Sequence, residues 1–92
     1  MKVRVRFFAR FRELLGTDIT AETAPGTALA GLIRDVAWRS REGYDAIFDE
    51  QGTFREFVIL MRNGKRVEAA DAEKTGVTDG DEIAVFPPVS GG

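Results

Sequence analysis

The stretch KVRVRF at residues 2–7 alternates charged and apolar side chains with a period of two. Successive side chains of a strand point to opposite faces, so this alternation is typical of a strand with one buried face. The core-facing side chains of this strand are expected to be Val3, Val5 and Phe7. Residues 18–24 alternate more weakly and are predicted to pair with residues 2–7 as a hairpin, after a short turn that Gly16 ends.

A helix is predicted to follow the turn at Pro25-Gly26, with Thr27 as its N-cap because a threonine hydroxyl can accept from a free backbone N–H in the first turn. The helix is expected to end near residues 39–41, before Gly43. Its apolar stripe recurs at i, i+3, i+4, i+7 and i+8 and consists of Leu29, Leu32, Ile33, Val36 and Ala37. Trp38 falls off this stripe, which favours packing at its rim over exposure to a partner.

The second half of the chain predicts three further strands. Residues 57–62 are rich in large apolar side chains, and the Asn63-Gly64 pair after them indicates a tight hairpin into residues 65–68. Residues 82–86 alternate again until Pro87-Pro88 forbids further ladder pairing. Residues 42–55 predict only a partly packed connection with an irregular tip, without an assigned function.

These elements predict an α+β fold, because one amphipathic helix needs one apolar sheet face to pack against. We expect a mixed sheet with one main helix across it. The predicted domain covers residues 1–86, and residues 87–92 form an extended tail. A chain of 92 residues fits one compact domain.

Composition excludes several classes of function. The chain contains no cysteine and no histidine, which removes disulfides, thiolate nucleophiles, imidazole bases and nearly every transition-metal site, so no metal site is predicted. Its net charge is −2, with 13 basic and 15 acidic residues, which argues against nucleic acid as a partner. The longest apolar run, residues 57–61, is far too short to span a membrane, and residues 2–7 do not resemble a signal sequence. A cytoplasmic location and no membrane partner are therefore expected.

The last six residues, PPVSGG at 87–92, change composition along their length. Two prolines favour an extended stem. Ser90, Gly91 and Gly92 lack bulk and end in a carboxylate, so they fit a narrow channel where a larger side chain would clash. On composition alone, a frayed terminus is as well supported as a functional tail, because the last residues of a domain are commonly poorly ordered.

The strand phase places two phenylalanines on the outer side of the sheet. Phe8 shares the phase of the charged residues in 2–7, and Phe86 shares the phase of Glu82 and Ala84. If the first and last strands are neighbours, the two rings form an apolar patch at the root of the tail, unless loops cover them. The same outer side carries a basic stripe, which indicates a solvated face or an electrostatic rim for an acidic partner. This stripe consists of Lys2, Arg4, Arg6, Arg10 and Arg12.

Two motifs carry a family resemblance: VRFFARFREL at residues 5–14 and DGDEIAVFPPVSGG at residues 79–92. With the Asn63-Gly64 hairpin between them, they make the chain similar to the MoaD family of sulfur-carrier subunits of molybdopterin synthase. The resemblance implies the β-grasp, or ubiquitin-like, fold. Residues 42–55 resemble the longer, archaeal-type members of this family.

The resemblance implies a non-catalytic carrier whose working group is the carboxylate of Gly92, presented beside Gly91. A MoeB-like adenylating enzyme would join it to AMP, and a sulfur nucleophile would then replace AMP to leave a thiocarboxylate. ATP and the sulfur donor would be used through that enzyme, and the chain itself would bind no cofactor. The thiocarboxylate would donate sulfur to a pterin precursor inside a MoaE-like large subunit. The residues that match the docking surface and inserted tail are Phe8, Phe86, Pro87, Pro88, Val89 and Ser90.

Two alternatives remain open. A ubiquitin-like modifier would join activated Gly92 to a lysine amine of a target protein, and the same tail serves that chemistry. A sulfur carrier for thiamin or cysteine synthesis would keep the sulfur chemistry and change the recipient. The segment Phe86-Pro87-Pro88-Val89 favours the pterin route, but the sequence does not distinguish molybdenum from tungsten as the metal finally loaded.

Overall fold

The computed structural model describes residues 1–88. The strands are β1 (Lys2–Phe7), β2 (Asp18–Glu22), β3 (Ile59–Arg62), β4 (Lys65–Val67) and β5 (Glu82–Phe86). The helices are α1 (Arg10–Leu15), α2 (Leu29–Ala37), α3 (Arg41–Ile47) and α4 (Ala69–Ala72).

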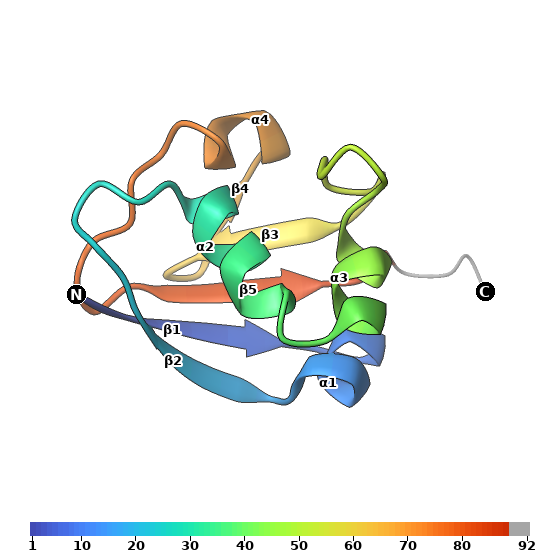
Figure 1. Ribbon diagram of the computed structural model, residues 1–92. Helices are drawn as coiled ribbons and strands as arrows, with labels where there is room; N and C mark the ends of the chain where they lie inside the picture. The colour runs from blue at the N-terminus through green and yellow to red at the C-terminus, as the bar shows by residue number, and fades with distance from the viewer. Residues whose placement is uncertain (89–92) are drawn as a thin grey trace.

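The five strands form one mixed sheet in the order β2-β1-β5-β3-β4. β1 and β5 run parallel at its centre, and the other neighbouring strands pair antiparallel. α2 crosses one face of the sheet, with α3 beside it (Figure 1). This arrangement confirms the predicted α+β, β-grasp fold and the hairpin pairing of the first two strands.

The core lies between the sheet and α2. Val3, Val5 and Phe7 are completely buried, which confirms the predicted inward face of the first strand. Leu29 and Ile33 from α2 are equally buried against them. The apolar face of β1 and the apolar stripe of α2 therefore pack against each other in one core, which removes their apolar surface from water.

The predicted start and end of the main helix were wrong by a few residues. α2 begins at Leu29, after the extended N-cap Ala28, and the Thr27 hydroxyl donates to the carbonyl of Ala24 instead of capping the helix. α2 ends at Ala37, and α3 begins at Arg41 after three residues. Its N-cap is Ser40, whose hydroxyl accepts from the N–H of Gly43 at 3.2 Å. Residues 41–47 are therefore helical, although no helix was predicted in the partly packed connection of residues 42–55.

Three other segments differ from the sequence-based prediction. α1 replaces the turn expected after the first strand, and α4 was not predicted. β3 begins at Ile59, because Phe57 takes a positive φ of 68° that does not fit a strand. The Phe57 side chain is 74% exposed.

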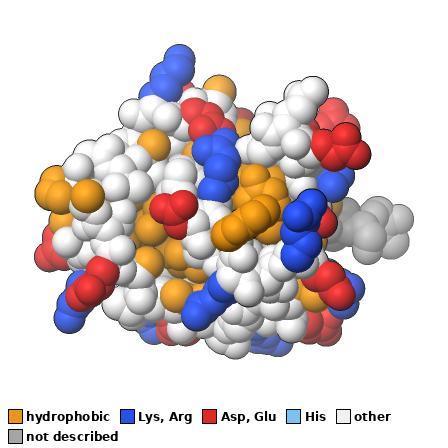
Figure 2. All heavy atoms as spheres, viewed as in Figure 1, with side chains coloured by type: hydrophobic (Ala, Val, Ile, Leu, Met, Phe, Trp, Pro, Cys, Tyr) orange, Lys and Arg blue, Asp and Glu red, His pale blue; other side chains and the backbone are white. Residues whose placement is uncertain are grey.

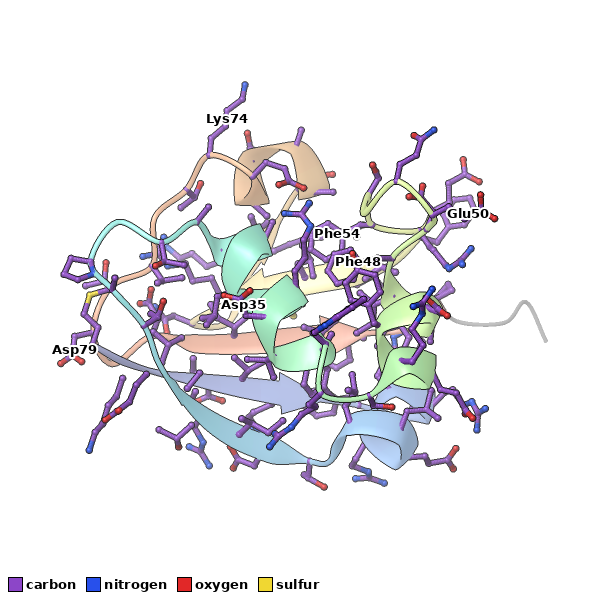
Figure 3. All side chains as sticks on the ribbon, in the orientation of Figure 1. Asp35, Phe48, Glu50, Phe54, Lys74 and Asp79 are labelled. Atoms are coloured by element: carbon purple, nitrogen blue, oxygen red, sulfur yellow. The ribbon has the colours of Figure 1, made fainter. Side chains whose placement is uncertain are left out.

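An aromatic cluster gives residues 42–55 a packed interior. The rings of Tyr44, Phe48 and Phe54 follow one another at centroid distances of 4.9 and 4.6 Å, and Figure 3 shows Phe48 and Phe54 lying together. Trp38 joins the outer end of the cluster with its edge against Tyr44, at 4.8 Å, yet remains 60% exposed. Trp38 therefore packs at the rim, as predicted, and keeps most of its surface exposed.

Asp81 is buried, although it ends an Asp-Gly-Asp motif that is typical of a solvated turn. It is 6% exposed and forms an ion pair with Arg62 at 2.8 Å. It also accepts from the side-chain amide of Asn63 at 2.9 Å and from the N–H of Thr78 at 2.8 Å. Burial raises the pKa of this carboxyl, but these hydrogen bonds and the Arg62 charge outweigh burial and hold the pKa below its ordinary value. The network ties the β3–β4 hairpin to the turn before β5.

Replacing this carboxylate is expected to destabilise the fold in a pH-dependent way. Asp81→Asn should lower the free energy of unfolding at neutral pH by about 2 kcal/mol, because Arg62 loses its partner. Because the pKa of Asp81 is lower in the native state than in the unfolded state, the ionised carboxylate stabilises the protein at pH values above the unfolded-state pKa. This stabilisation is lost as the pH falls through the native-state pKa. Urea unfolding should therefore show the difference between wild type and Asp81→Asn shrinking below about pH 4. Asp35→Asn, a matched control on the exposed side of α2, should change stability by less than about 0.5 kcal/mol at any pH.

The two helical glycines predict opposite effects of the same substitution. A Cβ on Gly31 in α2 would meet nothing within 4 Å, whereas a Cβ on Gly43 in α3 would lie 2.4 Å from Cγ of buried Leu15. Gly31→Ala should stabilise the protein by about 0.5–1 kcal/mol through helix propensity. Gly43→Ala should destabilise it by about 2 kcal/mol through overpacking. Thermal unfolding of both variants checks this, and equal shifts would contradict the packing of α3 on Leu15.

Within residues 1–88, the helices are all too short and too polar to cross a membrane.

Candidate functional site

The ends of the two central strands build the root of the tail. β1 and β5 are parallel, so both finish at the same edge of the sheet, and the N–H of Phe8 donates to the carbonyl of Val85 at 3.2 Å. The rings of Phe8 and Phe86 stack with a centroid distance of 4.3 Å and an interplanar angle of 12°. The predicted neighbourhood of the two rings is confirmed.

An apolar surface extends from this stacked pair across the open face of the sheet, opposite α2. Cross-strand partners Ile59 and Phe86, and Met61 and Ala84, bring β3 side chains beside those of β5. We call this surface the tail-root patch; it consists of Phe8, Ile59, Met61, Ala84 and Phe86. All five side chains are partly exposed. Sequence reasoning missed Ile59 and Met61, although their strand phase, once the β3–β5 register is known, places them there.

A shallow hollow adjoins the tail-root patch. It has a volume of about 420 Å³ and is lined by Phe57, Ile59, Arg66 and Pro88. The exposed ring of Phe57 and the ring of Pro88 make it mainly apolar, and Arg66 from β4 supplies a positive charge. Partner segments with an apolar side chain near a carboxylate fit this combination.

The other half of the open face carries paired charges. Arg4 forms an ion pair with Asp18 at 2.6 Å, and Arg6 forms one with Glu82 at 3.2 Å. The hydrogen bond to Asp18 raises the pKa of Arg4, and the same bond lowers the pKa of the Asp18 carboxyl. The predicted basic stripe is therefore largely neutralised at its centre by acids from β2 and β5. The guanidinium of Arg6 also lies 5.3 Å from the centre of the Phe8 ring, where the charged half meets the patch.

The remaining predicted site residues divide between two regions. Pro87 and Pro88 follow directly from β5, and Pro88 lines the hollow. Val89, Ser90, Gly91 and Gly92 lie outside the described residues, so the roles predicted for them stay predictions. Within residues 1–88, no three acidic side chains gather closely enough to hold a metal ion.

A family model matches almost the whole chain. The model described as the ThiS family covers residues 5–92. This chain belongs to the ThiS family. The resemblance inferred from the two terminal motifs is thereby confirmed.

Relatives within the ThiS family carry two kinds of name. Small archaeal modifier protein 3 from Haloferax volcanii is 33% identical over 92 residues and covers 100% of both chains. The molybdopterin synthase sulfur carrier subunit of Escherichia coli is 32% identical over 94 residues, covering 98% of this chain and 99% of its own. Proteins similar to this chain are thus named both as modifiers and as sulfur carriers.

Two solved structures add the fold and an assembly. A crystal structure of small archaeal modifier protein 1 from Haloferax volcanii has a TM-score of 0.80 at 21% identity, with 96% of this chain and 98% of that chain covered. The complex of subunits 1 and 2 of molybdopterin-converting factor from Helicobacter pylori contains a chain with a TM-score of 0.62 at 26% identity, and both chains are covered completely. A protein similar to this ThiS-family chain therefore assembles with a second subunit.

Proposed function

We propose that this chain is the sulfur-carrying small subunit of a molybdopterin synthase, with the Gly92 carboxylate as its working group. The observation that carries the proposal is the tail-root patch: stacked Phe8 and Phe86 form a partly exposed apolar surface where β5 leads into the tail. The family membership and the sulfur-carrier name of the Escherichia coli relative support it. In this proposal the chain is a donor, and the catalytic groups belong to its partners.

The chemistry begins with activation. A carboxylate is a poor electrophile because an oxide would have to leave, so a MoeB-like enzyme first joins a Gly92 oxygen to the α-phosphorus of ATP and releases pyrophosphate. A hydrosulfide nucleophile then attacks the acyl carbon, AMP leaves, and a thiocarboxylate remains. ATP is held by the activating enzyme in this scheme. The absence of cysteine from the chain is compatible with it, since the sulfur is carried on a carboxyl group.

Delivery is the second stage. The tail-root patch would dock on a MoaE-like large subunit while residues 87–92 enter its active site. There the terminal sulfur would attack a carbon of a pterin precursor and displace an oxygen leaving group. Water would then cleave the acyl–sulfur bond, which leaves one dithiolene sulfur on the pterin and restores the Gly92 carboxylate. The hollow beside Phe57 and Arg66 lies next to Pro88 and would be covered by the same partner.

The test is intact mass spectrometry of the full chain after incubation with a MoeB-like enzyme, ATP and sulfide. We expect one oxygen to be replaced by one sulfur, and the replacement to reverse when a MoaE-like subunit and the pterin precursor are added. An unchanged mass in a reaction that contains active enzyme would contradict the carrier role. A thiocarboxylate that persists with the synthase subunit present would contradict the pterin route alone.

A second candidate function, protein modification, is favoured by the names of the archaeal relatives. Here the activated Gly92 would form an amide with a lysine of a target protein. The same incubation, supplemented with cell extract, separates the two: an amide-linked adduct survives thiol reductants, whereas the carrier function yields only the free thiocarboxylate.

A further inference from the structure

The edge strand β2 offers unpaired backbone groups. β2 lies at the end of the sheet, with β1 as its neighbour. The N–H of Phe7 donates to the carbonyl of Thr17, and the N–H of Thr23 donates to the carbonyl of Met1. Hydrogen-bonded pairs recur every two residues in an antiparallel ladder, so Ile19 and Ala21 also face β1 through their backbone. The N–H and C=O groups of Thr20 therefore point away from the sheet.

A groove runs beside this free edge. Its volume is about 320 Å³, and it lies between β2 and α2 on the face of the sheet that the helix covers. Figure 2 shows apolar side chains gathered in this region. The apolar part of the lining consists of Ile19, Ala21, Leu32 and Val36.

The rim of the groove is charged. Glu22, Asp35 and Arg39 line it, and none of the three forms an ion pair within residues 1–88. Asp35 projects outward from α2 on the side of the molecule seen in Figure 3. Glu22 shares the strand phase of Asp18, so its side chain lies on the open face of the edge strand, whereas Asp35 lies on the helix side. Asp18, unlike Glu22 and Asp35, is paired with Arg4. Two free carboxylates against one free guanidinium favour a basic group on whatever binds there.

We propose that this groove binds an extended segment of a partner protein, which adds a strand to β2 and carries alternating aliphatic side chains with a flanking lysine or arginine. Backbone pairing with Thr20 supplies affinity, and the groove accepts every second side chain, as strand addition at a sheet edge requires. This surface is separate from the tail-root patch and does not depend on the proposed sulfur chemistry.

A second copy of the chain fits this edge poorly. Two β2 strands paired antiparallel about Thr20 would place Asp18 of each copy opposite Glu22 of the other. Like charges directly opposite each other destabilise a strand pair. A basic segment of a different protein avoids this repulsion and is therefore the expected occupant.

The first test uses the isotope-labelled full chain and the peptide acetyl-Lys-Ser-Val-Thr-Val-Thr-Val-Ser-Lys-amide, whose two lysines allow either strand direction. We expect amide shifts confined to residues 18–23 and 32–39, with a Kd on the order of 100 µM. The same peptide with glutamate in place of both lysines should bind at least about fivefold more weakly. Asp35→Lys should reverse that preference, and Glu42→Lys on α3, with the same charge change, should not.

The second test separates the contribution of the Thr20 backbone hydrogen bonds from that of the side chains. Thr20→Pro removes an N–H that faces outward, so it should leave the β1–β2 ladder intact and weaken peptide binding at least about tenfold. Thr20→Val keeps the N–H and should bind within about twofold of wild type. The proposal is overturned by shifts mapping to the tail-root patch, by no shifts at about 1 mM peptide, or by Thr20→Pro binding normally. Concentration-dependent shifts in residues 18–23 without peptide would overturn it in favour of a second copy.

Discussion

Removal of Gly92 is expected to abolish thiocarboxylate formation. The shortened chain still ends in a glycine carboxylate, that of Gly91, but this group is withdrawn by one residue, about 3.5 Å of extended backbone. Misplacing a reacting atom by about 1 Å can cost a factor of about 100 in rate. The truncated carboxylate should therefore not reach the α-phosphorus of ATP. Intact mass spectrometry after the activation reaction should show no sulfur-containing product.

The fold should not respond to this deletion. The buried side chains named for the core all lie within residues 1–88, and the central strands end at Phe7 and Phe86. The melting temperature of the truncated protein should stay within about 1 °C of wild type. Ser90→Ala, which keeps the carboxylate in place, should be thiolated within about threefold of the normal rate. Normal thiolation of the truncated protein would refute the assignment of Gly92.

The sheet was predictable because its signals are local. Alternation in residues 2–7 and 82–86 sets which side chains face α2, and the inward positions are buried as expected. A single phase argument also placed Phe8 and Phe86 together, since two parallel neighbours carry their outward side chains on one face.

The errors have different causes, some local and some in contacts between residues distant in sequence. Ser40 is a local N-cap signal, so the start of α3 was predictable from the sequence. Asp81, in contrast, looks like any turn carboxylate, and only its approach to Arg62 and Asn63 from another hairpin buries it. Phe57 belongs to an apolar run that predicts a strand, yet its positive φ turns it outward.

The candidate site was only partly predictable, because its residues come from strands that are distant in sequence. Ile59 and Met61 join the tail-root patch through the β3–β5 register, which pairs Ile59 with Phe86 and Met61 with Ala84. Strand order and register depend on the whole fold, so a single strand's pattern does not reveal them. The sequence therefore predicted the two rings at the centre of the tail-root patch, but it did not predict the extension of the patch onto β3.

Phe86→Arg is expected to weaken docking to a MoaE-like subunit by at least about 100-fold, measured by calorimetric titration. The substitution places a charge in the middle of the tail-root patch, beside Ile59, and docking would have to desolvate it without a partner. Arg6, which already lies over the Phe8 ring, adds repulsion. Because Phe86 is only partly buried, the free energy of unfolding should fall by less than about 1.5 kcal/mol.

Two controls separate docking from folding. Thr53→Arg adds the same charge at an exposed position in the loop after α3 and should leave docking unchanged, which excludes a general effect of net charge. Phe86→Leu keeps an apolar side chain but loses the stacking on Phe8, and should bind within about tenfold of wild type. If Phe86→Arg instead lowered the melting temperature by more than about 10 °C with docking intact, Phe86 would belong to the core and the partner would bind elsewhere. A desolvated apolar interface requires that Phe86→Arg bind far more weakly than Phe86→Leu, and that Thr53→Arg bind like wild type. A charge at position 86 costs more binding free energy than a smaller apolar side chain only if that position is buried against the partner.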